Sequence, residues 1–164
     1  PKNSFMGTIQ KIVILENIRS CHNVGALFRT ADGAGFDKIY CTGYTPTPPD
    51  RRIEKVSLGA ENFLSWEKVQ DTKALCLHLQ KEGFSLLALE QTQKAQNLFS
   101  FAFENAKLAL ILGNEVEGVT PEVLALAAQH LYIPMHGKKS SLNVSVAAGI
   151  ALYALKNLGN CGKI

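Results

Sequence analysis

The chain has 164 residues, of which 46% are hydrophobic and 19% are charged, and its formal net charge is +3. This length suits one domain with a sizeable core and is short for two, so we treat residues 1–164 as one domain. A run of about 18 apolar residues is absent, which excludes a membrane-spanning helix, and the small positive charge is compatible with nucleic-acid binding without demonstrating it.

The cysteines are widely separated, with no CxxC pair and no histidine at ligand spacing from any of them. A metal site is therefore not expected, and reduced, mostly buried thiols in a cytoplasmic protein are the favoured interpretation. They are Cys21, Cys41, Cys76 and Cys161.

The first third of the chain is predicted to form a strand–helix–strand unit. Residues 11–15 are a β-branched run typical of a buried strand, and residues 17–23 follow as a polar loop that ends at a good N-cap residue, Asn23. Apolar positions then recur at helical spacing until Gly35, and residues 38–42 are the second strand. A parallel sheet is implied.

The middle of the chain is less regular. Residues 44–52 are rich in proline and are predicted as a surface loop, whereas residues 53–63 are ambiguous, with a short helix as one reading. A helix is predicted over residues 67–82 and a third strand over residues 84–89, followed by loop over residues 91–105.

The last third begins with residues 108–112, a wholly apolar strand that we place at the centre of the sheet. Thr120 and Pro121 start a short helix that ends near Gln129, because threonine is a good N-cap and proline suits the first helical position. Residues 131–134 are the fifth strand and residues 144–158 the final helix.

Three polar loops follow apolar strands, at residues 17–23, 113–118 and 136–143. Loops at the carboxyl ends of strands form the ligand crevice of an open α/β sheet, so these three are expected to converge. Two alternatives remain open: the loops are ordinary turns, and the last one is only a helix start capped by Ser141 or Asn143. A GxGxxG motif is absent, which argues against a nicotinamide site.

Three segments resemble the three sequence motifs of the SpoU (TrmH-like) RNA ribose methyltransferases, in the SPOUT superfamily of S-adenosylmethionine-dependent enzymes. They occur in the family's order and span most of the chain. They are Asn23-Val-Gly-Ala-Leu-Phe-Arg-Thr-Ala-Asp-Gly-Ala-Gly35, Leu110-Ile-Leu-Gly-Asn-Glu-Val-Glu-Gly118 and Ile133-Pro-Met-His-Gly-Lys-Lys-Ser-Ser-Leu-Asn-Val-Ser-Val146.

The resemblance implies an open parallel α/β sheet with helices on both faces and a C-terminal trefoil knot, one of the rare exceptions to unknotted topology. It also implies transfer of a methyl group from S-adenosyl-L-methionine to a ribose 2′-hydroxyl of tRNA or rRNA, by a cytoplasmic homodimer that associates through the knotted region. The alternative function is a catalytically silent RNA-binding protein with the same fold.

The resemblance also implies roles for single residues. Asn23 would orient the catalytic loop, and Arg29 would meet the target nucleotide and activate its hydroxyl, either as hydroxyl activator or as proton acceptor. Glu115, Ser141 and Asn143 would complete the catalytic cluster. The cofactor would be held, largely through backbone groups, by Leu112, Gly113, Asn114, Ile133, Met135, Ser141 and Leu142.

Arg29 is flanked along its helix by Gly25 and Gly33, which would let a phosphate or ribose approach the guanidinium closely. The competing interpretation is an ordinary surface ion pair with Asp32 at i+3.

Further cations could contact RNA phosphates, although loops also carry such residues for solubility. With Arg29, the candidates are Arg51, Arg52, Lys138 and Lys139.

The final helix is apolar on two sides, which suits a core face and a dimer face; the competing interpretation is a helix sunk in its own core. Val144, Ala147, Ala151 and Leu155 mark one side, and Val146, Ile150 and Tyr153 the other.

Overall fold

Strand β6 (Lys107–Leu112) lies inside a parallel sheet, between β1 (Gln10–Glu16) and β4 (Ser85–Leu89). This is the central place expected for a wholly apolar strand, because both of its faces are covered. The computed structural model describes residues 10–103 and 105–156. Within them the sheet has the order β3-β2-β1-β6-β4-β7-β5, and every recorded strand pair is parallel. The outer strands are β2 (Lys38–Thr42), β3 (Ser65–Val69), β5 (Gln96–Asn97) and β7 (Gln129–Tyr132).

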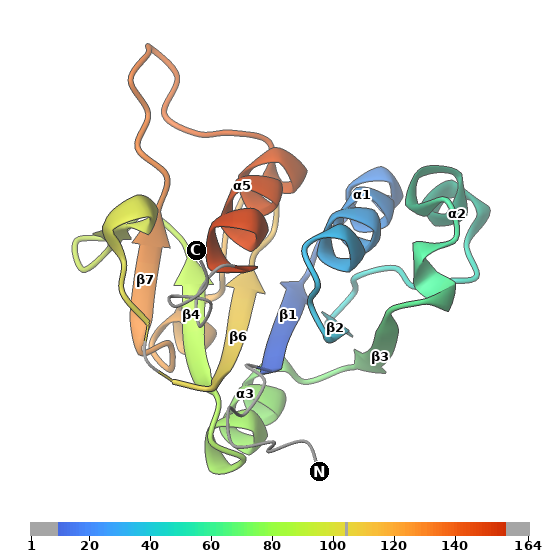
Figure 1. Ribbon diagram of the computed structural model, residues 1–164, viewed down its shortest axis with the longest axis horizontal. Coiled ribbons are helices and arrows are strands. Elements are labelled where there is room, and N and C mark those ends of the chain that lie inside the picture. The colour runs from blue at the N-terminus through green and yellow to red at the C-terminus, as the bar shows by residue number, and fades with distance from the viewer. Residues whose placement is uncertain (1–9, 104, 157–164) are drawn as a thin grey trace, which may run out of the picture.

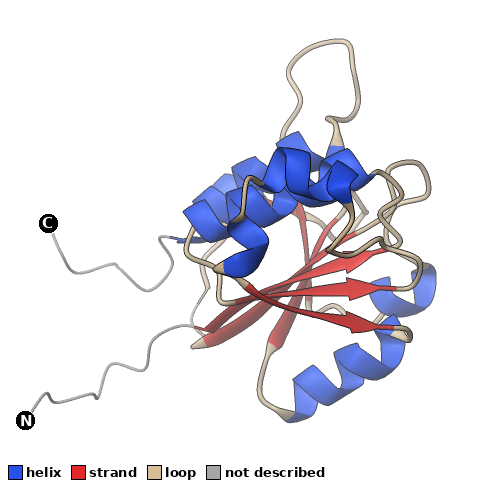
Figure 2. Ribbon diagram, turned by 90° about the vertical axis from the view of Figure 1, so that its right-hand side faces the viewer, coloured by secondary structure: helices blue, strands red, loops and turns tan. Residues whose placement is uncertain are grey.

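Helices cover both faces of the sheet (Figures 1 and 2). Alternate residues of β1 point to opposite faces, so Val13 and Leu15 join one apolar cluster while Ile12 and Ile14 join the other. The first cluster includes residues of α1 (Cys21–Gly33), α2 (Arg51–Ser57) and α5 (Val144–Lys156), and the second includes residues of α3 (Thr72–Lys81) and α4 (Pro121–Leu124). The predicted open α/β sheet with helices on both faces is confirmed.

Helix α1 begins earlier than the sequence predicts. The Ser20 hydroxyl, not the Asn23 side chain, caps the helix by accepting a hydrogen bond from the Asn23 backbone N–H at 3.1 Å. Asn23 therefore lies in the first turn, and its side-chain amide is available for a contact outside the helix.

Two predictions in the middle of the chain are wrong. Residues 65–69 form strand β3, although residues 67–69 were expected in a helix. The expected helix, α3, begins only at Thr72, because the Asp71 carboxylate caps it by accepting a hydrogen bond from the Ala74 backbone N–H at 3.0 Å. Arg51 and Arg52 stand in the first turn of α2, not in a loop, because Asp50 caps that helix. The ambiguous stretch that follows contains the rest of α2 and a 3₁₀ turn, η1 (Ala60–Asn62).

The remaining elements differ from expectation mainly in their ends. Residues 91–105, predicted as loop, contain β5 and the turn η2 (Leu98–Ser100). Helix α4 was expected to end near Gln129 but ends five residues earlier. Helix α5 starts at Val144 as predicted, whereas Leu158 and Cys161 lie outside the described residues. No helix in the described ranges is long and apolar enough to cross a membrane. The trefoil knot stays a prediction.

Candidate functional site

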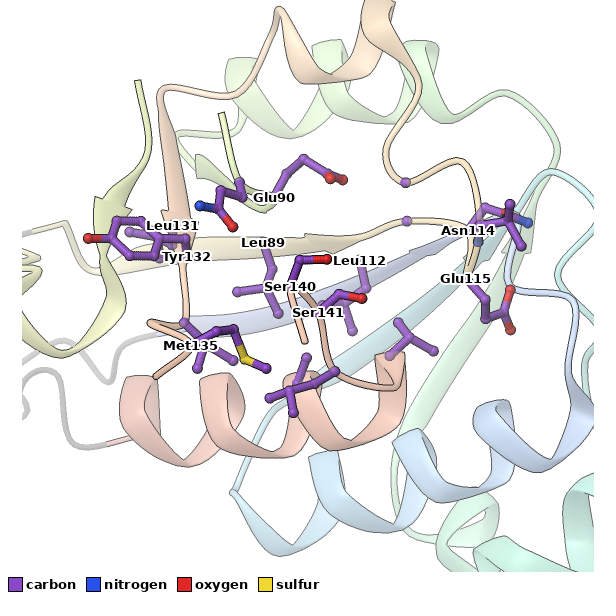
Figure 3. A pocket seen from close by; sticks show the side chains of 18 residues that line it. Leu89, Glu90, Leu112, Asn114, Glu115, Leu131, Tyr132, Met135, Ser140 and Ser141 are labelled. Carbon is purple, nitrogen blue, oxygen red and sulfur yellow. Dashed lines mark hydrogen bonds between the residues drawn. The ribbon is translucent and has the colours of Figure 1, made fainter. Parts of the chain in front are cut away.

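A cavity of about 260 Å³ lies at the carboxyl ends of β4, β6 and β7 (Figure 3). It is closed on one side by the start of α5 and by the long segment that joins β7 to α5, which projects from the body in Figure 1. All seven residues expected to hold the cofactor line this cavity: Leu112, Gly113, Asn114, Ile133, Met135, Ser141 and Leu142.

The Glu115 carboxylate joins the loop after β6 to the loop after β1. It accepts hydrogen bonds from the backbone N–H groups of Arg19, at 3.0 and 3.2 Å, and Ser20, at 3.1 Å. It also accepts one from the Asn23 side-chain amide at 3.1 Å. Two predicted catalytic residues, Asn23 and Glu115, are thus in direct contact although they are 92 positions apart in the sequence.

The pKa of the Glu115 carboxyl lies below its usual value near 4.5. Partial burial alone would raise this pKa, but the hydrogen bonds from the Arg19 N–H, the Asn23 amide and other backbone donors stabilise the charged form and outweigh it. Glu115 is therefore an anion that organises neighbouring backbone, which leaves little role for it as a proton carrier near neutral pH.

This lowered pKa predicts a pH-dependent contribution to stability. The contribution is fully present above the unfolded-state pKa and is lost as the pH falls through the lower folded-state pKa. We expect the free energy of unfolding to fall less steeply between about pH 5 and pH 3 in Glu115→Gln than in the wild type, because glutamine does not titrate. Urea unfolding at several pH values measures this, with the exposed Glu117→Gln as control. Equal slopes for wild type and Glu115→Gln would contradict the assignment.

Asn114 braces the same loop with its side chain. Its amide nitrogen donates to the Asn17 carbonyl and to the Tyr44 hydroxyl, both at 2.9 Å, while its amide oxygen accepts from the Val116 and Glu117 N–H groups, also at 2.9 Å. The side chain has no capacity left for a ligand. The Asn114 side chain therefore holds the loop that forms this cavity wall, and the expected contact of this residue with the cofactor stays a prediction.

The two predicted catalytic residues before α5 have different positions. Ser141 lines the cavity, whereas Asn143 caps α5: its side-chain oxygen accepts from the Ser145 N–H at 2.9 Å, and its carbonyl accepts from the Ala147 N–H at 2.9 Å. Of the two candidate caps, Asn143 is the one used.

Arg29 is exposed on α1, and within the described residues it forms no salt bridge with Asp32. The sequence suggested that the glycines beside Arg29 leave room for a ligand, but in the structure neighbouring helices fill that space. A Cβ on Gly25 would lie 2.5 Å from the Ile53 carbonyl of α2, and one on Gly33 would lie 2.8 Å from the Tyr153 hydroxyl of α5. Both glycines accommodate neighbouring helices.

The predicted phosphate-binding cations are all exposed, but one of them, Arg52, forms a salt bridge. The Arg52 guanidinium contacts the Asp50 carboxylate at 2.7 Å, and its hydrogen bond lowers the pKa of that carboxyl to about 2. Arg51 stands beside it at the start of α2, while Lys138 and Lys139 lie in the projecting segment before α5.

Sequence reasoning missed the loop after β4, where Glu90 and Gln91 also line the cavity. They directly follow a predicted strand of a parallel sheet, so the rule that placed the other loops there could have found them. The described residues contain no group of three or more metal-ligating side chains.

The cavity joins an apolar wall to a polar side that carries Glu115 and Ser141. Such a site suits a ligand with a flat apolar part and polar substituents, with Asn23 positioned next to it.

Comparisons with known proteins agree with this arrangement. The model of the SpoU rRNA Methylase family matches residues 10–153. The tRNA (guanosine(18)-2′-O)-methyltransferase of Aquifex aeolicus is 33% identical over 143 residues, which are 87% of this chain and 66% of that protein. The chain thus spans only about two thirds of this relative's length.

Solved structures show the same fold. The TrmH/SpoU tRNA modifying enzyme of A. aeolicus superimposes with a TM-score of 0.81 at 30% identity, over 92% of this chain and 75% of that one. The SpoU methyltransferase AviRb from Streptomyces viridochromogenes, in complex with AdoMet, gives a TM-score of 0.82 at 24% identity, over 92% and 60%. The second and third motifs line one cavity, and the first contacts its wall through Asn23 and Glu115. Since the family model also covers most of the sequence, the chain belongs to the SpoU rRNA methylase family.

Proposed function

We propose that this protein transfers a methyl group from S-adenosyl-L-methionine to a ribose 2′-hydroxyl of tRNA or rRNA, with residues 1–164 as one SpoU-type methyltransferase domain. One observation carries the proposal: the seven candidate cofactor residues line a single cavity, and the Asn23–Glu115 contact lies at its edge. Family membership and the AdoMet bound by AviRb, which has the same fold, support it.

The division of labour follows from the chemistry. The cofactor supplies an electrophilic methyl group on a sulfonium, whereas a ribose hydroxyl is a poor nucleophile that must be aligned and partly deprotonated. Glu115 and Asn23 hold the loop after β1, Ser141 borders the reacting centre, and Asn143 fixes the start of α5. Arg29 has no competing ion pair in the described residues, so its guanidinium is available to the target nucleotide.

Arg51, Lys138 and Lys139 supply the simplest phosphate contacts, because they are exposed and no ion pair of theirs occurs in the described part of the chain. Arg52 contributes more weakly, since Asp50 offsets its charge. A cytoplasmic location is proposed from the RNA substrate.

A transfer assay tests the function. Purified protein is incubated with radiolabelled S-adenosylmethionine and bulk tRNA or rRNA, and nuclease digestion identifies the product as a 2′-O-methylated nucleotide. Incorporation into RNA supports the proposal. If the donor binds but no label enters RNA, the protein is a silent relative that retains the fold.

The outer side of α5 supports a homodimer that forms through the knotted C-terminal region. Val146 and Tyr153 are 52% and 43% exposed, whereas Ala151 and Leu155 on the inner side are buried. We expect sedimentation at micromolar concentration to show a dimer for the wild type and a monomer for Val146→Glu, because a charge there opposes burial. Leu77→Glu, an exposed position on α3, is the matched control and should stay dimeric. A monomeric wild type would contradict the proposed interface.

A further inference from the structure

Glu90 is a cavity residue that no motif explains. It directly follows β4, and its Oε2 accepts a hydrogen bond from the Val119 N–H at 3.0 Å. Gly118 makes this approach possible: its φ is +73°, and a Cβ there would lie 2.5 Å from Oε2. The carboxylate is therefore held in one position against the loop after β6.

The other oxygen of Glu90 is unused. Within the described residues, Oε1 has no hydrogen-bond partner. Glu115, the second acid in the cavity wall, differs because both of its oxygens accept protein N–H groups. Glu90 is thus the carboxylate that retains an acceptor for a ligand.

The surroundings indicate which part of a ligand meets this oxygen. Leu112 and Leu131 belong to an apolar wall that suits a nucleobase (Figure 3). Glu115 contacts Asn23, and under the proposed function this pair lies on the side of the reacting centre. Glu90 stands apart from Glu115 at the end of the neighbouring strand. The part of an adenosine between its base and its 5′ substituent is the ribose, whose 2′- and 3′-hydroxyls are two adjacent donors.

We propose that Glu90 binds the ribose hydroxyls of the cofactor's adenosine through its free carboxylate oxygen. This inference rests on the proposed function, because it assumes an adenosine in the cavity. Hydrogen bonds to a charged acceptor are stronger than neutral ones, and Val119 orients the acceptor before the ligand arrives.

The test combines a side-chain change with removal of a ligand hydroxyl, measured by calorimetry without RNA. The probes are S-adenosylhomocysteine, adenosine, 2′-deoxyadenosine and 3′-deoxyadenosine. We expect Glu90→Gln to weaken binding of the first two by about 10-fold or more. Deleting the bound hydroxyl should cost a similar factor in the wild type but less than about 3-fold in Glu90→Gln, because the two changes remove the same contact. Glu117→Gln, on the loop after β6 but outside the cavity wall, should behave as wild type.

Each other result overturns the inference in a recognisable way. Unchanged affinity in Glu90→Gln leaves the proposed function intact and removes the role of Glu90. Weaker binding of S-adenosylhomocysteine but not of adenosine would place the carboxylate on the amino-acid end. Equal losses for adenosine and both deoxy analogues would show that Glu90 only braces the loop. If the wild type binds no probe, the cofactor proposal itself fails, and this inference with it.

Discussion

Replacing Arg29 by alanine is expected to lower methyl transfer to RNA by about 10³-fold, the upper end of the loss when one preorganised transition-state donor is removed. Affinity for S-adenosylhomocysteine should change less than about 2-fold, because Arg29 is exposed on α1 and is not part of the cavity wall. Stability should also change little, since the side chain makes no ion pair in the described residues. Single-turnover transfer with labelled donor and calorimetry with the product measure the two quantities.

Two variants serve as controls for this prediction. Arg29→Lys keeps the charge but loses the planar guanidinium and its paired N–H donors. If bidentate geometry matters, its rate of methyl transfer should lie between those of the wild type and Arg29→Ala. Lys73→Ala removes an exposed cation from α3, which packs on the other face of the sheet, and should leave transfer unchanged. Cofactor affinity that collapses together with transfer in Arg29→Ala would show that the side chain acts on the cofactor.

The sequence predicted those elements whose patterns depend on local physics. Strand β6 is apolar on both faces and was located correctly, and α5, which carries helical spacing from its first residue, starts where it was predicted to start. Strand β3 was not, because exposed and half-buried residues at the sheet edge give no clear alternation. Its pairing with β2 is a long-range contact that no local pattern encodes.

The candidate site was predictable to the level of loops. Parallel strands place their carboxyl ends at one edge, so loops after β1, β6 and β7 had to meet there. The contacts between them were not predictable: the Arg19 N–H that Glu115 accepts is 96 positions away, and the Tyr44 hydroxyl that Asn114 contacts is 70 away. Glu90 was missed because it matches no motif, although its place after a strand was visible.

Replacing Gly113 by alanine should damage the cofactor cavity itself. A Cβ at this position would lie 2.2 Å from the Gly118 carbonyl carbon and from the Val119 nitrogen. Backbone atoms cannot rotate away as a side-chain end can, so the loop that carries Glu115 must shift. Overpacking of this kind costs about 1–3 kcal/mol. We expect a loss of that size in the free energy of unfolding.

Affinity for S-adenosylhomocysteine should fall roughly 5- to 150-fold in Gly113→Ala, if a similar 1–3 kcal/mol is lost from binding when the wall moves. Urea unfolding and calorimetry measure the two effects. Gly137→Ala is the matched control, because a Cβ there meets no atom within 4 Å, and it should keep both quantities at wild-type values. Gly113→Ala is expected to weaken binding of the methyl donor, whereas Arg29→Ala is expected to slow methyl transfer without weakening that binding, so the two variants separate the two steps. Wild-type affinity in Gly113→Ala would mean that the loop after β6 does not form the wall on which the cofactor rests.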